Sequence, residues 1–317
     1  MKYIFRISVI VLVSVVFLIS CGSPEKKSFK KKKEKSANEI ALLEQDKRED
    51  LKAAANHVKE RRTISYFYNK YGKVSERGFL VEKKMYDEKG RLTEVIRFLS
   101  NGDIDLRWTY EYNDNDEIVH SKTVNGMNFI RYERKSTYDD EGKEIEREEY
   151  DVKSKKFNKI VYEYDDKGNL LVTKTYNSDG NLLFLENNEY DSAGKIVLKK
   201  LENPEGALFT VTQTEYDSLG RKAKEYMRDF RDKPSLVIFV YDSLGYLKGK
   251  NRGFVNELFI NDENGNVVTE KLFDSEGGLQ QRIDFFYDKN GLLSERIRYD
   301  GMEKPALFIK YEYEFYQ

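Results

Sequence analysis

Apolar and polar residues alternate over short stretches along most of the chain. Between residues 104 and 112, Ile, Leu, Trp, Tyr and Tyr occupy every second position, with Asp, Arg, Thr and Glu between them. Residues 307–315 repeat the pattern with Leu, Ile, Tyr, Tyr and Phe. Successive side chains of a strand point to opposite faces, so this alternation predicts β-strands with one covered face. The 23 Tyr and 19 Phe suit the pleated surface of such strands.

A five-residue pattern, Tyr-Asp-x-x-Gly, punctuates these strands at a nearly constant interval. Copies or worn copies begin at residues 86, 112, 138, 164, 190, 216, 241, 261 and 287. Five of the steps are 26 residues long, and the shortest, of 20 residues, falls between Tyr241 and Asn261. A fixed period of this size indicates a repeat architecture.

Each copy of the pattern predicts a tight turn between two strands. Asp at the first turn position bonds the backbone two residues on, and Gly three residues later tolerates the left-handed conformation that closes a hairpin. We therefore assign these residues a structural role. The predicted turn residues are Asp87 and Gly90, Asp139 and Gly142, Asp165 and Gly168, Asp191 and Gly194, Asp217 and Gly220, Asp242 and Gly245, Asp262 and Gly265, and Asp288 and Gly291.

A second turn lies twelve residues after several of these glycines, at Gly102, Gly180, Gly206 and Gly277. Each unit thus reads strand, turn, strand, turn. The predicted fold is all-β, an antiparallel meander of about nine two-strand units, or about 18 strands. Open sheets beyond about 10 strands curl or split, so we expect a long, twisted and curled sheet with its Tyr/Phe face turned inwards and a short N-terminal helix.

The repeated pattern resembles the RHS (YD) repeat family, whose units read Tyr-Asp-x-x-Gly-Arg-Leu. Residues 86–92 (YDEKGRL) match every fixed position, and residues 164–170 (YDDKGNL) nearly do. The resemblance covers roughly residues 63–317, but its spacing is longer and more even, and no toxin segment follows the repeats. It implies a β-repeat fold and a surface location without toxin activity. MORN-like hairpin arrays fit less well.

The first 20 residues read as a secretory leader. Lys2 and Arg6 precede an apolar run from Ile7 to Ile19, which is shorter than the ~20 residues of a membrane-spanning helix. The run ends in Leu-Ile-Ser before Cys21, which resembles the lipobox of bacterial lipoproteins. That resemblance implies an acylated Cys21 and, because Gly22 follows, a lipid anchor in the outer membrane facing the periplasm or the cell surface. A free or buried thiol at Cys21 is the alternative.

Three further segments follow the leader. Residues 21–36 combine Cys21 with a Lys-rich tether, which either spaces the protein from the membrane or lies against anionic head groups. Residues 37–61 predict a charged amphipathic helix, either a cap on the first strands or a free spacer. Residues 62–317 form the predicted YD-like β-repeat domain.

The chemistry of the chain argues against most enzyme classes. A net charge of −1 gives no general attraction to nucleic acid, and the sequence has only two His and one Cys. Gly-x-Ser-x-Gly, His-Glu-x-x-His and phosphate-loop motifs are missing from the sequence, and the repeated Asp residues lack the spacing of known calcium loops. We predict no cofactor, no metal and no catalytic residue. A glycan hydrolase that uses paired Asp/Glu carboxylates is the alternative.

Aromatic residues on a solvated sheet are the best candidates for recognition. Trp108, Tyr110 and Tyr112 form the richest patch; the alternative is that they belong to the packed face. We predict a lipid-anchored, non-enzymatic envelope protein whose extended β surface binds a protein or a polysaccharide. A membrane-embedded barrel is disfavoured by strands such as residues 143–149 (KEIEREE), which offer no uncharged band.

Overall fold

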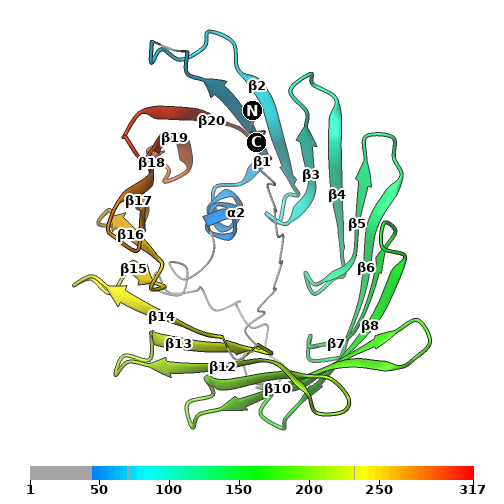
Figure 1. Ribbon diagram of the computed structural model, residues 1–317. Helices are drawn as coiled ribbons and strands as arrows, with labels where there is room; N and C mark the ends of the chain where they lie inside the picture. Colours follow the sequence, from blue (N-terminus) through cyan, green and yellow to red (C-terminus); the bar gives the residue numbers. More distant parts are fainter. Residues whose placement is uncertain (1–44, 70, 232) are drawn as a thin grey trace, which may run out of the picture.

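The computed structural model describes residues 45–69, 71–231 and 233–317 (Figure 1). Cys21, the leader and the tether lie outside this part of the chain. The described residues form one short helix, α2 (Gln45–Ala55), followed by a sheet of 20 strands. The first ten strands are β1 (Val58–Phe67), β2 (Phe79–Tyr86), β3 (Leu92–Phe98), β4 (Ile104–Tyr112), β5 (Ile118–Asn125), β6 (Ile130–Tyr138), β7 (Glu144–Asp151), β8 (Lys156–Tyr164), β9 (Leu170–Asn177) and β10 (Leu182–Tyr190).

The second ten strands continue the same antiparallel meander. They are β11 (Ile196–Glu202), β12 (Leu208–Tyr216), β13 (Lys222–Asp229), β14 (Pro234–Tyr241), β15 (Leu247–Asn251), β16 (Val255–Asn261), β17 (Val267–Asp274), β18 (Leu279–Tyr287), β19 (Leu293–Asp300) and β20 (Pro305–Phe315). The shortened repeat step after Tyr241 corresponds to β15, whose five residues make it the shortest of these strands.

The sheet closes into a barrel, which corrects the predicted open, curled sheet. Strand β1 pairs antiparallel with β2 on one side and with β20 on the other, from Val58 opposite Phe315 to Phe67 opposite Leu307. Every other strand pairs with its two neighbours in the chain, and the ring is complete in Figure 1. Closure leaves no unpaired sheet edge, so it satisfies the backbone groups that an open meander exposes at both ends.

The predicted helix over residues 37–61 was also too long at its C-terminal end. Helix α2 ends at Ala55, and residues 58–61 belong to β1. Four consecutive charged residues, residues 59–62, open this strand after Val58, and a charged run of this kind is equally typical of the solvated end of an amphipathic helix. The 20 strands exceed the expected 18 because the nine YD turns join β2 to β19 in pairs, with β1 before the first pair and β20 after the last.

Helix α2 lies inside the ring and identifies the inner wall (Figure 1). Asp50 of α2 accepts hydrogen bonds from Lys84 Nζ at 2.8 Å and from Tyr86 Oη at 2.7 Å. Residues directly opposite each other in paired strands share a face. From Lys84 the inner face therefore passes through Val95 and Trp108, which follow one another across β3 and β4. The same register runs around the barrel and returns to β1.

The packed core is confined to the neighbourhood of the helix. One cluster joins Ala53 of α2 to Val58, Tyr86 and Leu292, and a second joins Val267, Phe285 and Leu293 of the wall. Elsewhere most inner side chains are half-buried, and the buried ones include polar residues such as Thr123, Arg134 and Glu144. Barrels of 16–18 strands already leave a water-filled interior, so a ring of 20 strands is too wide for its own side chains to fill.

Candidate functional site

The repeated turns gather at one end of the barrel, which we call the YD end. At Asp165 the backbone oxygen accepts a hydrogen bond from Gly168 N, and Oδ1 accepts two more, from Lys167 N and Asn169 N, at 2.9 and 2.8 Å. Gly168 has φ +84°, a left-handed conformation that favours glycine. The other seven predicted Asp–Gly pairs have this geometry, and the turn at Asn113 has it with Asp116 in place of the glycine.

The tyrosine that begins most units, and Tyr313 at the equivalent place in β20, bonds its own hairpin to the preceding YD turn, a role the sequence did not reveal. Tyr164 Oη donates a hydrogen bond of 2.7 Å to the backbone oxygen of Glu144, 20 residues earlier. Seven other tyrosines donate in the same way: Tyr112 to Leu92, Tyr138 to Ile118, Tyr190 to Leu170, Tyr216 to Ile196, Tyr241 to Lys222, Tyr287 to Val267 and Tyr313 to Leu293. We call these eight bonds the tyrosine ladder.

A basic residue after the turn glycine covers several of these tyrosine rings. The cation of Arg91 lies 4.8 Å from the centre of the Tyr112 ring, and that of Arg221 lies 4.2 Å from the Tyr241 ring. Lys143 and Lys195 stand in the same way over the tyrosines of the next units. The signal was present in the sequence as Arg or Lys directly after the turn Gly, and cation–π contacts at such sites contribute about 0.5–1 kcal/mol each.

The predicted recognition patch lies on the inner wall. Trp108 is directly opposite Val95 and Thr123, on the face that continues from Lys84, and Arg97 stands 5.5 Å from the Trp108 ring. Burial raises the pKa of the Tyr110 hydroxyl to about 12, and the carboxylate of Asp50 on α2 contributes. These aromatic residues therefore line the lumen and do not offer an outer binding surface.

An ionic cluster stands on the same wall at β6, β7 and β8. Arg134 Nη2 lies 2.9 Å from Glu144 Oε1, and Arg147 Nε lies 3.0 Å from the same oxygen. Burial disfavours the charge of Glu144, but the bonds and charges of Arg147 and Arg134 outweigh it and lower the pKa of Glu144. Arg147 also covers the Tyr162 ring at 5.3 Å. The cluster stays ionised and presents cations and aromatic rings to the lumen.

The outer wall has a different character, with oppositely charged residues paired across neighbouring strands. Lys159 lies 2.8 Å from Glu146, and His120 lies 2.8 Å from Glu133. Further cross-strand pairs of this kind are Arg107 with Glu94, Lys174 with Glu163, Lys200 with Glu189 and Lys224 with Glu215. An outer wall of paired, exposed charges is compatible with contact with water.

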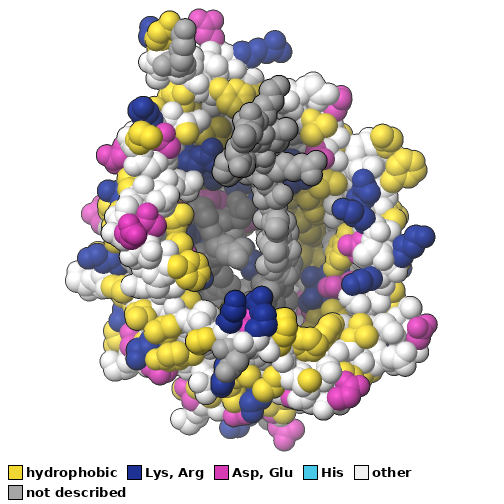
Figure 2. Space-filling view, viewed as in Figure 1, with side chains coloured by type: hydrophobic (Ala, Val, Ile, Leu, Met, Phe, Trp, Pro, Cys, Tyr) yellow, Lys and Arg dark blue, Asp and Glu magenta, His cyan; other side chains and the backbone are white. Residues whose placement is uncertain are grey.

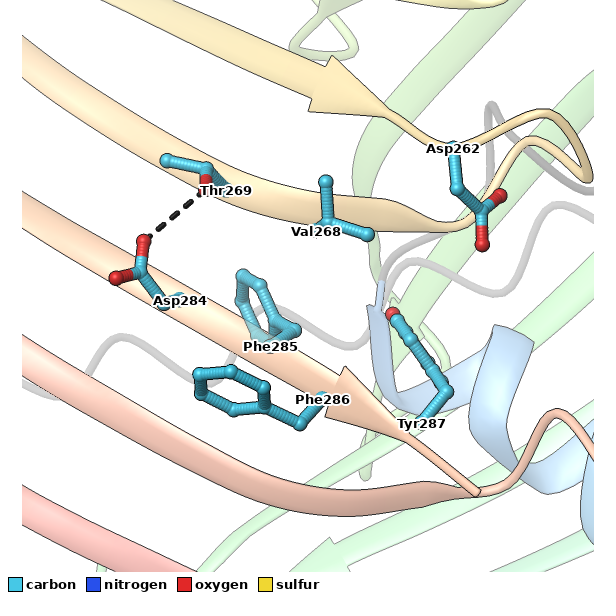
Figure 3. Close-up of a pocket in the computed structure, with 7 residues that line it drawn as sticks. All are labelled: Asp262, Val268, Thr269, Asp284, Phe285, Phe286 and Tyr287. Atoms are coloured by element: carbon cyan, nitrogen blue, oxygen red, sulfur yellow. Dashed lines mark hydrogen bonds between the residues drawn. The ribbon is translucent and has the colours of Figure 1, made fainter. Parts of the chain in front are cut away.

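The hollow drawn in Figure 3, of about 530 Å³, does not have the features of a binding site. It lies along β17 and β18, and its outward-facing Thr269 and Asp284 bond each other at 3.0 Å. Its polar groups are thus already used, and it is a shallow depression in the barrel wall. The lumen is the better candidate because it gathers rings and charges from many strands.

Two searches of the described residues gave no candidate. Residues 45–69, 71–231 and 233–317 hold no group of three or more His, Cys, Asp or Glu side chains placed to bind a metal. Within the same ranges, the helix is not long and apolar enough to cross a membrane.

No protein-family model matches the chain, and no curated protein matches it. Among solved structures, a chain of the Photorhabdus luminescens Tc holotoxin pore is similar at 12% identity, with 74% of this chain and 13% of that chain covered and a TM-score of 0.39. A porin-like protein from Bacteroides uniformis is similar at 10% identity (81% and 98% covered, TM-score 0.36). A DUF1329 family protein from Desulfovibrio piger is similar at 8% identity (87% and 90% covered, TM-score 0.26). Likenesses this low do not identify a function.

Proposed function

We propose that this chain is a non-enzymatic, lipid-anchored protein of the bacterial outer membrane whose barrel lumen binds a segment of a glycan. The observation that carries the proposal is the contrast between the two walls. The outer wall pairs its charges with one another, while the inner wall directs Trp108 and the tyrosines at an interior that the described residues do not fill. The ionised Arg134–Glu144–Arg147 cluster lies beside these rings, with its charges paired to one another.

The inner wall suits a sugar better than a lipid. Aromatic rings stack on the apolar faces of sugars, and charged and hydroxyl groups bond their hydroxyls. An acyl chain in the same place would bury Arg134, Glu144 and Arg147 away from water without new partners, which is costly. Thr173 and Glu186 continue the polar wall across β9 and β10, since they lie opposite each other beside Tyr162.

The barrel as a whole suits an aqueous compartment. A transmembrane barrel needs an uncharged outer band, because charges at the middle of a bilayer cost ~2–4 kcal/mol each. The cross-strand ion pairs of Lys159 and Lys174 stand in the middle of strands, where that band would be. The permanent anchor is then the acylated Cys21, and Cys21→Ser should abolish acylation and shift the protein from the membrane towards the soluble fraction.

The single Trp of the chain provides the test of glycan binding. Soluble Cys21→Ser protein is titrated with envelope glycan fragments while the emission of Trp108 is recorded. We expect a saturable change, and Tyr162→Ala should weaken binding about tenfold, the effect of one lost stacking contact of ~1.4 kcal/mol. Tyr150→Ala, a half-exposed tyrosine of the outer wall, is the matched control and should bind normally. Binding that Tyr150→Ala weakens and Tyr162→Ala does not would contradict a site in the lumen.

One observation keeps the hydrolase as a second candidate. Glu257 and Glu270 stand on neighbouring strands of the inner wall, and burial, followed by the charge of Glu257, raises the pKa of Glu270. Glycoside hydrolysis uses a pair of carboxyl groups, one of which is an acid with a raised pKa. However, Arg252 bonds Glu257 at 3.0 Å. Cleavage of a bound glycan that Glu270→Gln abolishes would favour the hydrolase over our proposal.

A further inference from the structure

The end of the barrel opposite the YD end carries apolar side chains at the tips of its hairpins. We call this end the rim. Because the meander alternates, every connection from an odd-numbered strand to the next even-numbered one lies there. The most exposed apolar tips, each 65–78% exposed, are Tyr71, Met127, Phe129, Phe230, Phe254 and Met302. The apolar residues of the outer wall are all less exposed, with Val240 at 47% among the highest.

These tips come from five hairpins spread around the ring. Tyr71 lies between β1 and β2, Met127 and Phe129 between β5 and β6, and Met302 between β19 and β20. The β19–β20, β1–β2 and β5–β6 hairpins form a first arc of the rim. Phe230 and Phe254 belong to the β13–β14 and β15–β16 connections, which form a second arc. Exposed apolar groups of this size are costly in water, and their concentration at one end indicates an interaction surface.

Basic residues accompany the tips. Lys153 and Lys155 are exposed in the β7–β8 connection and Lys156 at the start of β8, next to the hairpin of Met127. Lys233 is exposed beside Phe230, and Arg231, also exposed, bonds Asp229 through its guanidinium at 2.6 Å. The β9–β10 and β17–β18 hairpins, which carry Asp179 and Glu276, lie between the two arcs and have no comparable apolar tip. Figure 2 shows hydrophobic, basic and acidic side chains interspersed around a hollowed face of the barrel.

The YD end has the opposite character. The central positions of its turns hold Glu88, Asp114, Asp140, Asp166 and Glu263. Leu219 and Leu244 are its exposed apolar tips among the described residues, and no exposed ring accompanies them at the turns. The YD end is therefore more acidic and less apolar at its tips than the rim, although the rim also carries acidic residues such as Asp103, Asp179 and Glu205. An anionic surface would repel the YD end more strongly than the rim.

We propose that the rim docks on the surface of an anionic phospholipid bilayer, with the barrel standing on the membrane. The spacing of the tips favours a bilayer over a folded partner: they are separate projections around a hollow mouth, and a fluid layer can close around each of them. Phe and Met inserted among acyl chains, with Lys and Arg at the level of the phosphates, is the arrangement of interfacial membrane binding. This contact is additional to the anchor proposed at Cys21 and does not depend on the glycan.

Co-sedimentation with vesicles tests the proposal on the full chain carrying Cys21→Ser, so that no acyl group contributes. Vesicles of phosphatidylethanolamine and phosphatidylglycerol are compared with vesicles of phosphatidylcholine. We expect binding to the anionic vesicles, and at least a tenfold loss of affinity for Phe129→Ser/Phe254→Ser. Leu219→Ser/Leu244→Ser at the YD end is the matched control and should bind as the parent does. Circular dichroism checks that both variants fold, which exposed tips should not affect.

The remaining outcomes contradict the proposal. The parent protein failing to bind anionic vesicles, or the rim variant binding them as well as the YD-end control, would show that the rim is not a membrane surface. Retention of an envelope protein that requires Phe129 and Phe254, without binding to vesicles, would assign the rim to a protein partner instead.

Discussion

At the scale of single residues, each fixed position of the Tyr-Asp-x-x-Gly unit has its own structural role. Asp165 and Gly168 form the turn, while Tyr164 donates to the Glu144 backbone oxygen. This bond links two successive YD turns, which are separated in the chain by β7, β8 and the connection between them. The sequence predicted the turn because Asp and Gly act on their own backbone. It did not predict the tyrosine bond, because that bond depends on how consecutive hairpins stack. Where Asn261 replaces the tyrosine, its side-chain amide donates to the Leu247 oxygen at 3.0 Å.

Removal of one tyrosine hydroxyl tests whether the tyrosine ladder contributes to stability. Tyr164→Phe removes the hydroxyl and keeps the ring under Lys143, so the free energy of unfolding should fall by about 1 kcal/mol, the typical net value of a hydrogen bond. Tyr150→Phe on the outer wall is the control and should change it by less than about 0.5 kcal/mol. Urea unfolding of both variants measures the difference. Equal stabilities would mean that the ladder contributes nothing.

At the scale of elements, the position of α2 was the least predictable feature. Its alternating charges predicted a helix, and both expected placements, a cap on the first strands and a free spacer, assumed an open sheet. In the barrel, the wall encloses Glu49 and places Asp50 beside Lys84 and Tyr86. Lys84 and Tyr86 belong to β2 and lie 34 and 36 residues after Asp50, so no pattern within the helix itself could predict these contacts. The strands themselves were predictable, because alternation and turn residues define a hairpin locally.

The burial of Glu49 makes the stability of α2 against the barrel wall dependent on pH. Glu49 is 3% exposed, and burial raises its pKa even though Lys52 lies 3.2 Å away and opposes the shift. A raised pKa means that the folded state favours the neutral carboxyl. The stability from this group is therefore full below its ordinary pKa of about 4.5 and is lost as the pH rises through the raised value.

Glu49→Gln should remove this dependence. At pH 4 the variant and the parent should protect the backbone amides of α2 equally, and at pH 7.5 the variant should protect them several-fold better. Hydrogen exchange across this pH range measures both. Glu88→Gln, at an exposed turn of the YD end, is the control and should follow the parent. Slower exchange of the α2 amides in the parent than in Glu49→Gln at neutral pH would contradict the burial argument.

At the scale of the whole molecule, closure decides what kind of function is available. The open meander offered an extended concave surface, whereas the barrel offers a lumen with its own wall and two unlike ends. Repeats specify each strand's neighbours in the chain, but the pairing of β1 with β20 joins residues about 250 positions apart. It depends on the twist accumulated over all 20 strands, which no single repeat encodes. Tyr316 marks the seam by donating to the Tyr86 backbone oxygen at 2.7 Å.

A disulfide across the seam tests closure most directly. Arg62 and Glu312 lie opposite each other in β1 and β20, and Cys21→Ser removes the natural cysteine. Under mild oxidation, Arg62→Cys/Glu312→Cys should form an intramolecular cross-link in nearly all molecules, since directly opposed strand residues lie within disulfide reach. The pair Arg62→Cys/Lys174→Cys, with its second cysteine on the distant strand β9, should not. In an open sheet the first and last strands would stand about 90 Å apart at ~4.8 Å per strand. Failure of the seam pair to cross-link within one molecule would contradict the closed barrel.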